Sequence, residues 1–455
     1  MVQKSLEQTL VVLGAGPKAL AIAAKRNVLA ALGWKLPRVF IVEAKNVAAH
    51  WSGKNGYTDG NQALGTPPQK DVGFPYSSSC WGGANAEVDC RMLAFSWTTF
   101  QVACRRFAGW IDRHQPAPTH AEWGRYLEWV AQIVAPVIPI SGLPSKQTGI
   151  IQASVQQIDI RKSRWSLACT FNNLKFRIGS DGLVVTGPGP PRTFPGQSKN
   201  PPMSSQGIPR LTDGRSFWTY LGRFRSLPPP SIGIVGAGET AASVAVALVQ
   251  IFGPSCNIEV INPSGMAYSR GESFVENRLF TDPRGWTARS KADRLEFVER
   301  TDRGVFSLQA KSILDRAENV ETVAGRVERI DASKTKVAVT TSYDGKVSTS
   351  SYDYLIVAAG FDPLWFVSIL SSTVQDRLKL AVGSTTKEAI QEKISPDLSI
   401  TGLVPRLHLP MLAGFAQGPG FPNLSSLGLL SDRVLATYST GVPTGAMATQ
   451  VSREA

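Results

Sequence analysis

Histidine and cysteine are scarce in this chain, so the sequence offers few residues for metal or sulfur chemistry. Its 455 residues include four histidines and five cysteines, with no C-x-x-C pair and no two histidines spaced i, i+4. These spacings argue against a metal site, a disulfide framework and a redox-active dithiol. The G-x-S-x-G and G-x-x-x-x-G-K-[ST] motifs are also absent. Common hydrolase and phosphoryl-transfer designs are therefore disfavoured.

Long apolar runs are missing as well. The two most apolar windows, 10–24 and 234–252, are interrupted by Lys18 and Glu239, so no transmembrane segment is expected. The first ten residues lack the pattern of a secretion signal, and the odd cysteine count fits a reducing compartment, so we expect a cytoplasmic protein.

Acidic residues are outnumbered by basic ones. Lysine and arginine total 48 against 35 aspartates and glutamates, a formal net charge of +13. Such a surplus attracts polyanions, which include nucleic acid, phosphorylated cofactors and anionic membranes. A nucleic-acid-binding protein on a nucleotide-binding scaffold stays open as an alternative, although the sequence has no RNP-like motif, zinc finger or clustered basic helix to support it.

The most informative pattern in the sequence is a glycine-rich turn between an apolar strand and a helix. The apolar segment 9–13 is followed by Gly14, Gly16 and Ala19, then by an alanine-rich helical stretch to residue 31. Gly14 permits a sharp turn, Gly16 lets the backbone approach a pyrophosphate, and Ala19 allows close helix packing. The next apolar segment ends at Glu43, where an acidic side chain reaches a ribose hydroxyl in dinucleotide-binding folds.

The same order of elements recurs later in the chain. Residues 231–235 lead to Gly236 and Gly238, a second alanine-rich helix follows, and the next strand ends at Asn262. Because an amide does not repel a 2′-phosphate as a carboxylate does, we expect FAD in the first unit and NADPH in the second. Arg270 is the candidate partner of the 2′-phosphate, with a solvated surface arginine as the alternative.

The two units predict an α/β fold with two dinucleotide-binding Rossmann-like domains and a small helical substrate region. The apolar segments 182–187 and 354–360 each end in glycine, and we expect both in the first domain, as the strands by which the chain leaves and returns. We therefore predict an FAD-binding part at 1–230 that includes the substrate-region helices. An inserted NADPH domain follows at 231–352, and the FAD domain with the C-terminal part of the substrate site returns at 353–455.

One helix is predicted in detail. Thr119 and Glu122 form a Thr-x-x-Glu capping box, and apolar residues follow at helical spacing to Val134.

Several longer blocks carry a resemblance to a known family. They include LGTPPQKDVGFPY at 64–76 and GPGFPNLS at 418–425, together with 51–60, 236–243, 270–277 and 301–306. With these blocks the chain resembles the flavin-dependent N-hydroxylating monooxygenases, and most of all the lysine N6-monooxygenases of mycobactin-type siderophore pathways. The resemblance implies an NADPH-reduced FAD, a flavin C4a-hydroperoxide formed with oxygen, and transfer of oxygen to the side-chain amine of L-lysine.

The resemblance also implies site residues. Lys70 matches the family's lysine beside the flavin and the substrate carboxylate, and Asn277 matches the asparagine that contacts substrate and nicotinamide ribose. Ser431 is matched to the serine near the amino-acid end of the substrate, and Trp51 opens the block on the flavin side. Asp302 stands where ornithine-hydroxylating relatives carry asparagine; it either attracts the substrate α-amine or is a surface charge paired to Arg303.

Some features leave the substrate open. Gly65 replaces a glutamine of the ornithine-hydroxylating relatives, which points away from ornithine, and Ser52 replaces a family histidine. Ornithine, another primary amine or an acylated lysine remain alternatives, because one methylene is worth only ~1–3 kcal/mol of selectivity. We expect small-molecule substrates, molecular oxygen and a homo-oligomer, with no nucleic-acid partner.

Overall fold

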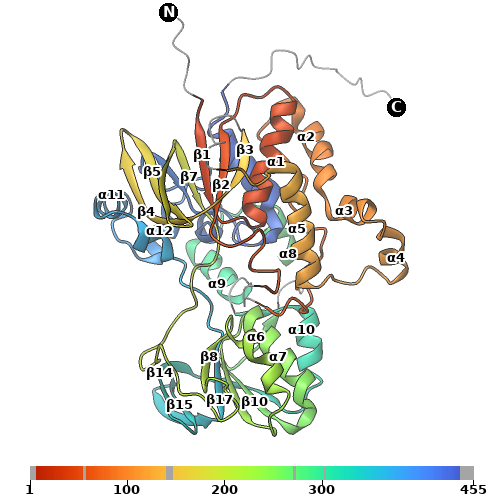
Figure 1. The fold of residues 1–455 in the computed structure, drawn as a ribbon, viewed down its shortest axis with the longest axis vertical. Coiled ribbons are helices and arrows are strands. Elements are labelled where there is room, and N and C mark those ends of the chain that lie inside the picture. The colour runs from red at the N-terminus through yellow and green to blue at the C-terminus, as the bar shows by residue number, and fades with distance from the viewer. Residues whose placement is uncertain (1–6, 55–57, 140–146, 270–272, 302–303, 441–455) are drawn as a thin grey trace, which may run out of the picture.

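The computed structural model describes residues 7–54, 58–139, 147–269, 273–301 and 304–440, which form two domains around two parallel sheets (Figure 1). The first sheet has the order β18-β7-β1-β2-β3. Its strands are β18 (Arg406–His408), β7 (Gly182–Val185), β1 (Thr9–Leu13), β2 (Arg38–Glu43) and β3 (Thr148–Gln152). Every pairing is parallel, so the buried strands are continuously apolar rather than alternating.

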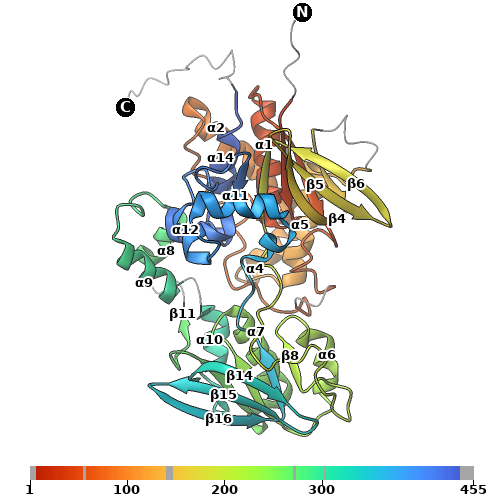
Figure 2. The ribbon, with the colours of Figure 1, turned by 90° about the vertical axis from the view of Figure 1, so that its left-hand side faces the viewer.

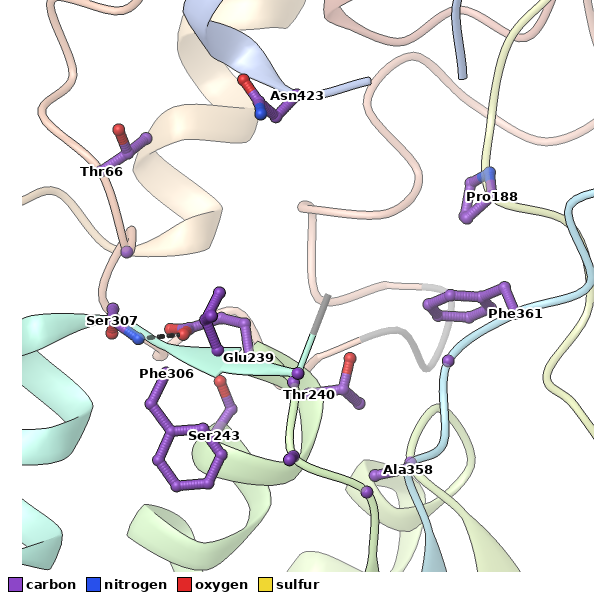
Figure 3. A pocket seen from close by; sticks show the side chains of 18 of the residues that line it. Thr66, Pro188, Glu239, Thr240, Ser243, Phe306, Ser307, Ala358, Phe361 and Asn423 are labelled. Carbon is purple, nitrogen blue, oxygen red and sulfur yellow. Dashed lines mark hydrogen bonds between the residues drawn. The ribbon is translucent and has the colours of Figure 1, made fainter. Parts of the chain in front are cut away.

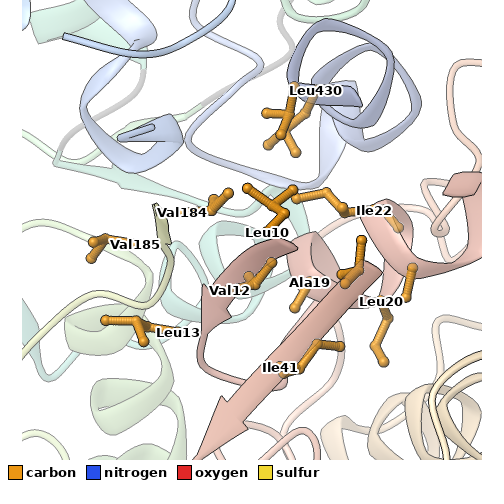
Figure 4. Close-up of a cluster of buried hydrophobic side chains, with 14 of the residues drawn as sticks. Leu10, Val12, Leu13, Ala19, Leu20, Ile22, Ile41, Val184, Val185 and Leu430 are labelled. Atoms are coloured by element: carbon orange, nitrogen blue, oxygen red, sulfur yellow. The ribbon is translucent and has the colours of Figure 1, made fainter. Parts of the chain in front are cut away.

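Helices cover the first sheet and close its core. The helices packed here are α1 (Pro17–Ala31), α5 (His120–Val134) and α14 (Leu427–Ala436). Figure 4 shows Ala19 and Ile22 of α1 and Leu430 of α14 near strand residues such as Leu10. The predicted capping box is confirmed, because Thr119 accepts a hydrogen bond from the Glu122 amide and Glu122 accepts one from the Thr119 amide.

Peripheral elements complete the first domain. They are the antiparallel sheet β4 (Ser154–Arg161), β5 (Arg164–Phe171) and β6 (Leu174–Ser180), a helical arm of α2 (Asn85–Met92), α3 (Trp97–Ala103) and α4 (Phe107–Asp112), and the C-terminal helices α11 (Ser372–Val382), α12 (Lys387–Glu392) and α13 (Gly414–Gln417). The arm extends away from the sheet in Figure 1. Among the described residues, no helix has the length and apolar character that crossing a bilayer requires.

The second sheet has the order β13-β10-β9-β17-β8 and is also wholly parallel. Its strands are β13 (Val320–Ala324), β10 (Asn257–Asn262), β9 (Ser231–Val235), β17 (Tyr354–Val357) and β8 (Leu211–Asp213). The helices of this domain are α6 (Phe217–Phe224), α7 (Glu239–Phe252) and α10 (Leu308–Leu314), and its antiparallel sheet contains β14 (Arg326–Ala332), β15 (Val337–Tyr343) and β16 (Lys346–Tyr352).

The predicted domain boundaries differ from this division. Strand β17 was expected in the first domain, but it pairs with β9 and β8 in the second sheet. Strand β8 and helix α6 also belong to the second domain, because Phe217 and Phe224 pack in the same core as Ile232. The second domain therefore extends beyond the predicted range 231–352 at both ends. A short apolar strand that ends in glycine is compatible with either parallel sheet, so the sequence pattern of β17 does not determine to which domain it belongs.

Two linkers connect the domains and pair with each other. The Arg192 amide donates to the Gly360 carbonyl (3.1 Å), and the Asp362 amide donates to the Pro190 carbonyl (2.8 Å). Pro191 and Phe361 form the antiparallel bridge between them. The chain thus leaves and re-enters the first domain at one place.

A pair of helices crosses from one domain to the other. Helices α8 (Phe274–Thr281) and α9 (Lys291–Thr301) lie in sequence between β11 (Tyr268–Ser269) and β12 (Val305–Phe306). They nevertheless pack on the C-terminal part of the first domain, as Figure 2 shows for α8 and α9 beside α12. The Trp286 indole donates to the Phe415 carbonyl (2.9 Å), and the Ser426 hydroxyl donates to the Phe280 carbonyl (2.8 Å). The substrate-region helices were predicted within 1–230, whereas α8 and α9 from the middle of the chain also pack on the first domain.

Candidate active site

A cavity of about 1480 Å³ lies between the two domains. Its lining comes from the first domain, the second domain and helix α8. Figure 3 shows Thr66 and Asn423 on one side and Glu239, Thr240 and Ala358 on the other. Of the predicted site residues, Trp51, Lys70, Gly236, Gly238 and Asn277 line it.

The first glycine turn is built to leave backbone donors accessible. Gly14 has φ +92° and its amide donates to the Val42 carbonyl (2.9 Å), which ties the turn to β2. Gly16 caps helix α1 with extended backbone and no side-chain hydrogen bond, and a Cβ atom there would meet nothing within 4 Å. This open helix N-terminus fits a pyrophosphate, whose charge the exposed N–H groups favour. Ala19 is fully buried beneath the turn.

Glu43 lies at the end of β2, as predicted. One carboxylate oxygen accepts from the Ala15 amide (2.7 Å) and the other from the Lys45 amide (2.7 Å). The carboxylate therefore fixes the glycine turn, and each oxygen keeps a lone pair for a ribose hydroxyl. Gly14, Gly16 and Glu43 are not among the residues that line the cavity between the domains.

The second glycine turn opens directly into the cavity. Gly236 has φ +133°, and a Cβ atom there would lie 2.3 Å from the Ala358 carbonyl oxygen, so only glycine fits. Gly238 caps helix α7 with no side-chain hydrogen bond, and a Cβ atom on it would meet nothing within 4 Å. Glu239 turns aside to accept from the Ser307 amide (2.6 Å), the bond drawn in Figure 3. This turn also fits a pyrophosphate.

Lys70 and Asn277 reach the cavity from different halves of the chain. The Lys70 ammonium donates to the Ser425 hydroxyl (3.1 Å) and lies 5.9 Å from the centre of the Phe74 ring. Asn277 projects from α8, whose start is capped by Ser273. Because α8 packs on the segment that contains Ser425, the fold brings both predicted substrate residues into the lining of one cavity.

Ser431 does not join them. It is fully buried in α14, is absent from the cavity lining, and its hydroxyl donates to the backbone carbonyls of Leu427 (3.0 Å) and Gly428 (2.8 Å). The structure thus does not bring Ser431 to the site, and Ser425 occupies the position beside Lys70. The Asn423 side chain fixes Ser425 by accepting from its amide (2.8 Å). Asp302 and Arg270 lie outside the described residues.

A buried carboxyl group, Asp71, follows Lys70 directly in the chain. Asp71 accepts from the Tyr76 hydroxyl (2.7 Å) and the Trp97 amide (2.9 Å), which anchors the loop next to Lys70. Burial raises the pKa of Asp71 to about 6, against the opposing effect of these hydrogen bonds.

Two histidines that sequence analysis did not select also line the cavity. His50 and His120 each form an edge contact with the Trp51 ring, at centroid distances of 5.5 and 5.1 Å. Desolvation lowers the pKa of both imidazoles to about 4. Both rings are therefore neutral at physiological pH, and with Trp51 they form a largely apolar wall. Among the described residues, no group of three or more His, Cys, Asp or Glu could hold a metal ion.

Comparisons with known proteins identify the family. No protein-family model matches the chain. It is 39% identical over 436 residues to the L-lysine N6-monooxygenase MbtG of Mycobacterium tuberculosis, covering 94% of this chain and 95% of the relative. It is 38% identical over 451 residues to MbtG of Mycobacterium sp. strain MCS, covering 98% and 97%.

Solved structures agree with these relatives. The lysine monooxygenase NbtG from Nocardia farcinica has a TM-score of 0.79 at 40% identity, covering 94% of this chain and 100% of the other. The ornithine N-hydroxylase KtzI from Kutzneria sp. 744 has a TM-score of 0.70 at 16% identity, with 95% and 99% coverage, a likeness of fold alone. The chain is an enzyme that belongs to the L-lysine N6-monooxygenase family.

Proposed function

We propose that this protein hydroxylates the side-chain amine of L-lysine to N6-hydroxylysine with FAD, NADPH and molecular oxygen, for a hydroxamate siderophore. The observation that carries the proposal is the meeting of Lys70, Ser425 and Asn277 in the cavity that also contains the second glycine turn. Gly14, Gly16 and Glu43 would hold FAD, with Trp51 on the flavin side of the site. Gly236 and Gly238 would hold NADPH. When bound, the flavin reduced by NADPH supplies the activated oxygen.

The lysine side chain supports substrate binding by charge. A free amino acid presents an α-carboxylate, and the Lys70 ammonium offers it a charge-assisted hydrogen bond while Ser425 orients that ammonium. Asn277 offers both a donor and an acceptor from α8. Ser425 replaces Ser431 in this proposal, and Asp302 stays the proposed partner of the α-amine.

The part of the cavity wall that Trp51, His50 and His120 form supports the chemistry because it is uncharged at neutral pH. The reacting amine of lysine has an ordinary pKa of about 10.4, and only its neutral form is nucleophilic. Desolvation lowers the pKa of an amine, and the neutral His50, His120 and Trp51 provide one apolar stretch of the wall, whereas Lys70 and Arg326 carry charge elsewhere in the lining. Exclusion of water also limits the wasteful release of hydrogen peroxide.

Replacement of Lys70 tests the proposal. Lys70→Ala should raise the KM for lysine about 10- to 100-fold, the usual value of a hydrogen bond to a charged group, while the purified protein keeps its flavin. Ser425→Ala should weaken lysine binding less, since it orients the ammonium only. N6-hydroxylysine is measured by mass spectrometry beside NADPH consumption.

The matched control is Lys346→Ala, an exposed lysine on β16 outside the cavity. Its KM for lysine should equal that of the wild type. Peroxide production that no amine alters, in a flavin-loaded wild type, would show that lysine is not the substrate. The same panel separates lysine from ornithine and acylated lysine.

We also propose a cytoplasmic homo-oligomer. All five cysteines are free, which fits a reducing compartment. Four exposed apolar side chains of the helical arm could be covered by a second copy: Leu93, Val102, Phe107 and Ile111. Sedimentation analysis of the holoenzyme tests this proposal.

A further inference from the structure

Asn262, the last residue of β10, has a buried donor aimed at no protein group. Its side chain is 2% exposed, and its Oδ1 atom accepts from the Ser264 amide (3.1 Å) and hydroxyl (2.9 Å). These two bonds fix the orientation of the amide. Within the described parts of the chain, its Nδ2 atom has no hydrogen-bond partner. Because an unsatisfied buried donor is costly, this atom points to a ligand acceptor.

The position of Asn262 identifies the part of the ligand that it meets. The Gly236 amide donates to the Ile261 carbonyl (2.9 Å), so the glycine turn and the end of β10 are adjacent. Asn262, Gly236 and Gly238 line the same cavity. In dinucleotide-binding folds, the end of this strand reads the 2′ position of the adenosine ribose.

Arg326 contributes a cation near Asn262 at the end of β10. The Gly325 amide donates to the Asn262 carbonyl (2.8 Å), so the next residue, Arg326, lies beside the end of β10. Its side chain is exposed, lines the cavity and, among the described residues, makes no ion pair or side-chain hydrogen bond. Arg329 on the same strand differs, because it is paired to Asp331 (2.7 Å) and lies outside the cavity.

We infer that Asn262 and Arg326 together bind the 2′-phosphate of NADPH and set its preference over NADH. Arg326 takes here the role predicted for Arg270, which lies outside the described residues. The inference rests on the proposed function, because it concerns the nicotinamide cofactor of that reaction. The guanidinium supplies charge and forked donors for phosphate oxygens, and the Nδ2 atom supplies a neutral donor from the strand end. A carboxylate at position 262 would repel the phosphate.

Nucleotide binding to the oxidised holoenzyme tests the inference without turnover. Calorimetric titration with NADP⁺ and NAD⁺ should show NADP⁺ binding weakened at least 10-fold in Arg326→Ala, with NAD⁺ binding changed less than 2-fold. Arg329→Ala, the control on the same strand, should match the wild type for both nucleotides. Asn262→Asp should reverse the preference, because its new charge repels the 2′-phosphate and accepts from a ribose hydroxyl.

Equal weakening of NADP⁺ and NAD⁺ in Arg326→Ala, or no weakening of either, would overturn the inference. A wild type that binds the two nucleotides equally would overturn it as well. None of these titrations contains lysine, so failure of lysine hydroxylation and failure of 2′-phosphate recognition are separate results.

Discussion

The two nucleotide-binding units share a backbone design but differ at the residue that ends the second strand. Gly16 and Gly238 cap their helices with nearly the same dihedral angles, φ −92° and −95°. Glu43 ends the first unit and donates no hydrogen bond, whereas Asn262 ends the second and carries an N–H donor without a protein partner among the described residues. In the proposed assignment, the glycines let each unit accept a dinucleotide, and the residue at the strand end selects FAD in the first unit and NADPH in the second.

The largest expected effect comes from placing a bulky side chain at each glycine turn, where a pyrophosphate is proposed to bind. Gly16→Leu and Gly238→Leu should both fold, because each Cβ atom meets no protein atom within 4 Å and the backbone is extended. We expect Gly16→Leu to lose FAD by about 100-fold or more in affinity and to purify colourless. Gly238→Leu should remain yellow and lose NADPH binding instead.

Flavin absorbance and NADP⁺ titration measure both variants. A yellow Gly16→Leu protein with wild-type FAD affinity would contradict the assignment of the first unit. Loss of flavin from both variants would mean that FAD binding depends on the second glycine turn as well as on the first.

An intermediate effect is expected in the pH dependence of stability, which should differ between the two domains. Burial lowers the pKa of His50, His120 and His408, all in the first domain, to about 4, whereas residues 194–358 contain no histidine. Protonation of these imidazoles from the ordinary value near 6.5 favours the unfolded chain, so stability falls as the pH falls from 6.5 to 4. Asp71, with its pKa raised to about 6, acts in the opposite direction over part of this range. We expect a net loss of about 3–5 kcal/mol in the first domain.

Hydrogen exchange at pH 7 and pH 5, corrected for intrinsic rates, measures this difference. Peptides from β1 and β18 should lose protection, and peptides from β9 and β10 should not. Equal loss in the two sheets would show that acid sensitivity does not follow the buried histidines.

The smallest effect concerns the first strand end. Glu43→Gln keeps one acceptor oxygen but cannot accept from the Ala15 and Lys45 amides through two oxygens at once. We expect FAD affinity to fall about 3- to 10-fold, the usual range for one lost hydrogen bond. Fluorescence of released flavin measures the dissociation constant, and an unchanged value would leave the carboxylate with no part in FAD binding.

Local sequence signals predicted what local structure determines. The strand–turn–helix units, the helix starting at the Thr119 capping box and the fold class follow from spacing and residue type within about 30 residues, and each is confirmed. The placement of β17 was wrong, because the choice between two parallel sheets depends on long-range pairing.

The site residues show the same limit more sharply. Ser425 is 355 positions from Lys70, and no local pattern connects them. Ser431, six positions further on, was selected by alignment of a short motif, but its helix turns its hydroxyl into the α14 backbone. The sequence singled out Asn262 only because its side chain is uncharged. That its Nδ2 atom has no hydrogen-bond partner among the described residues depends on the bond between Ser264 and the Oδ1 atom, which only the structure shows.

The crossing of α8 and α9 has a consequence for the catalytic cycle. These helices belong by sequence to the second domain but are fastened to the first through Trp286 and Ser426. A rotation of the second sheet about the paired linkers would therefore move Gly236, while α8, which carries Asn277, stays packed on the segment that contains Ser425. The residues proposed to hold the amino acid would then keep their arrangement when the second glycine turn moves, so the amino-acid site and the nucleotide site would be mechanically separable.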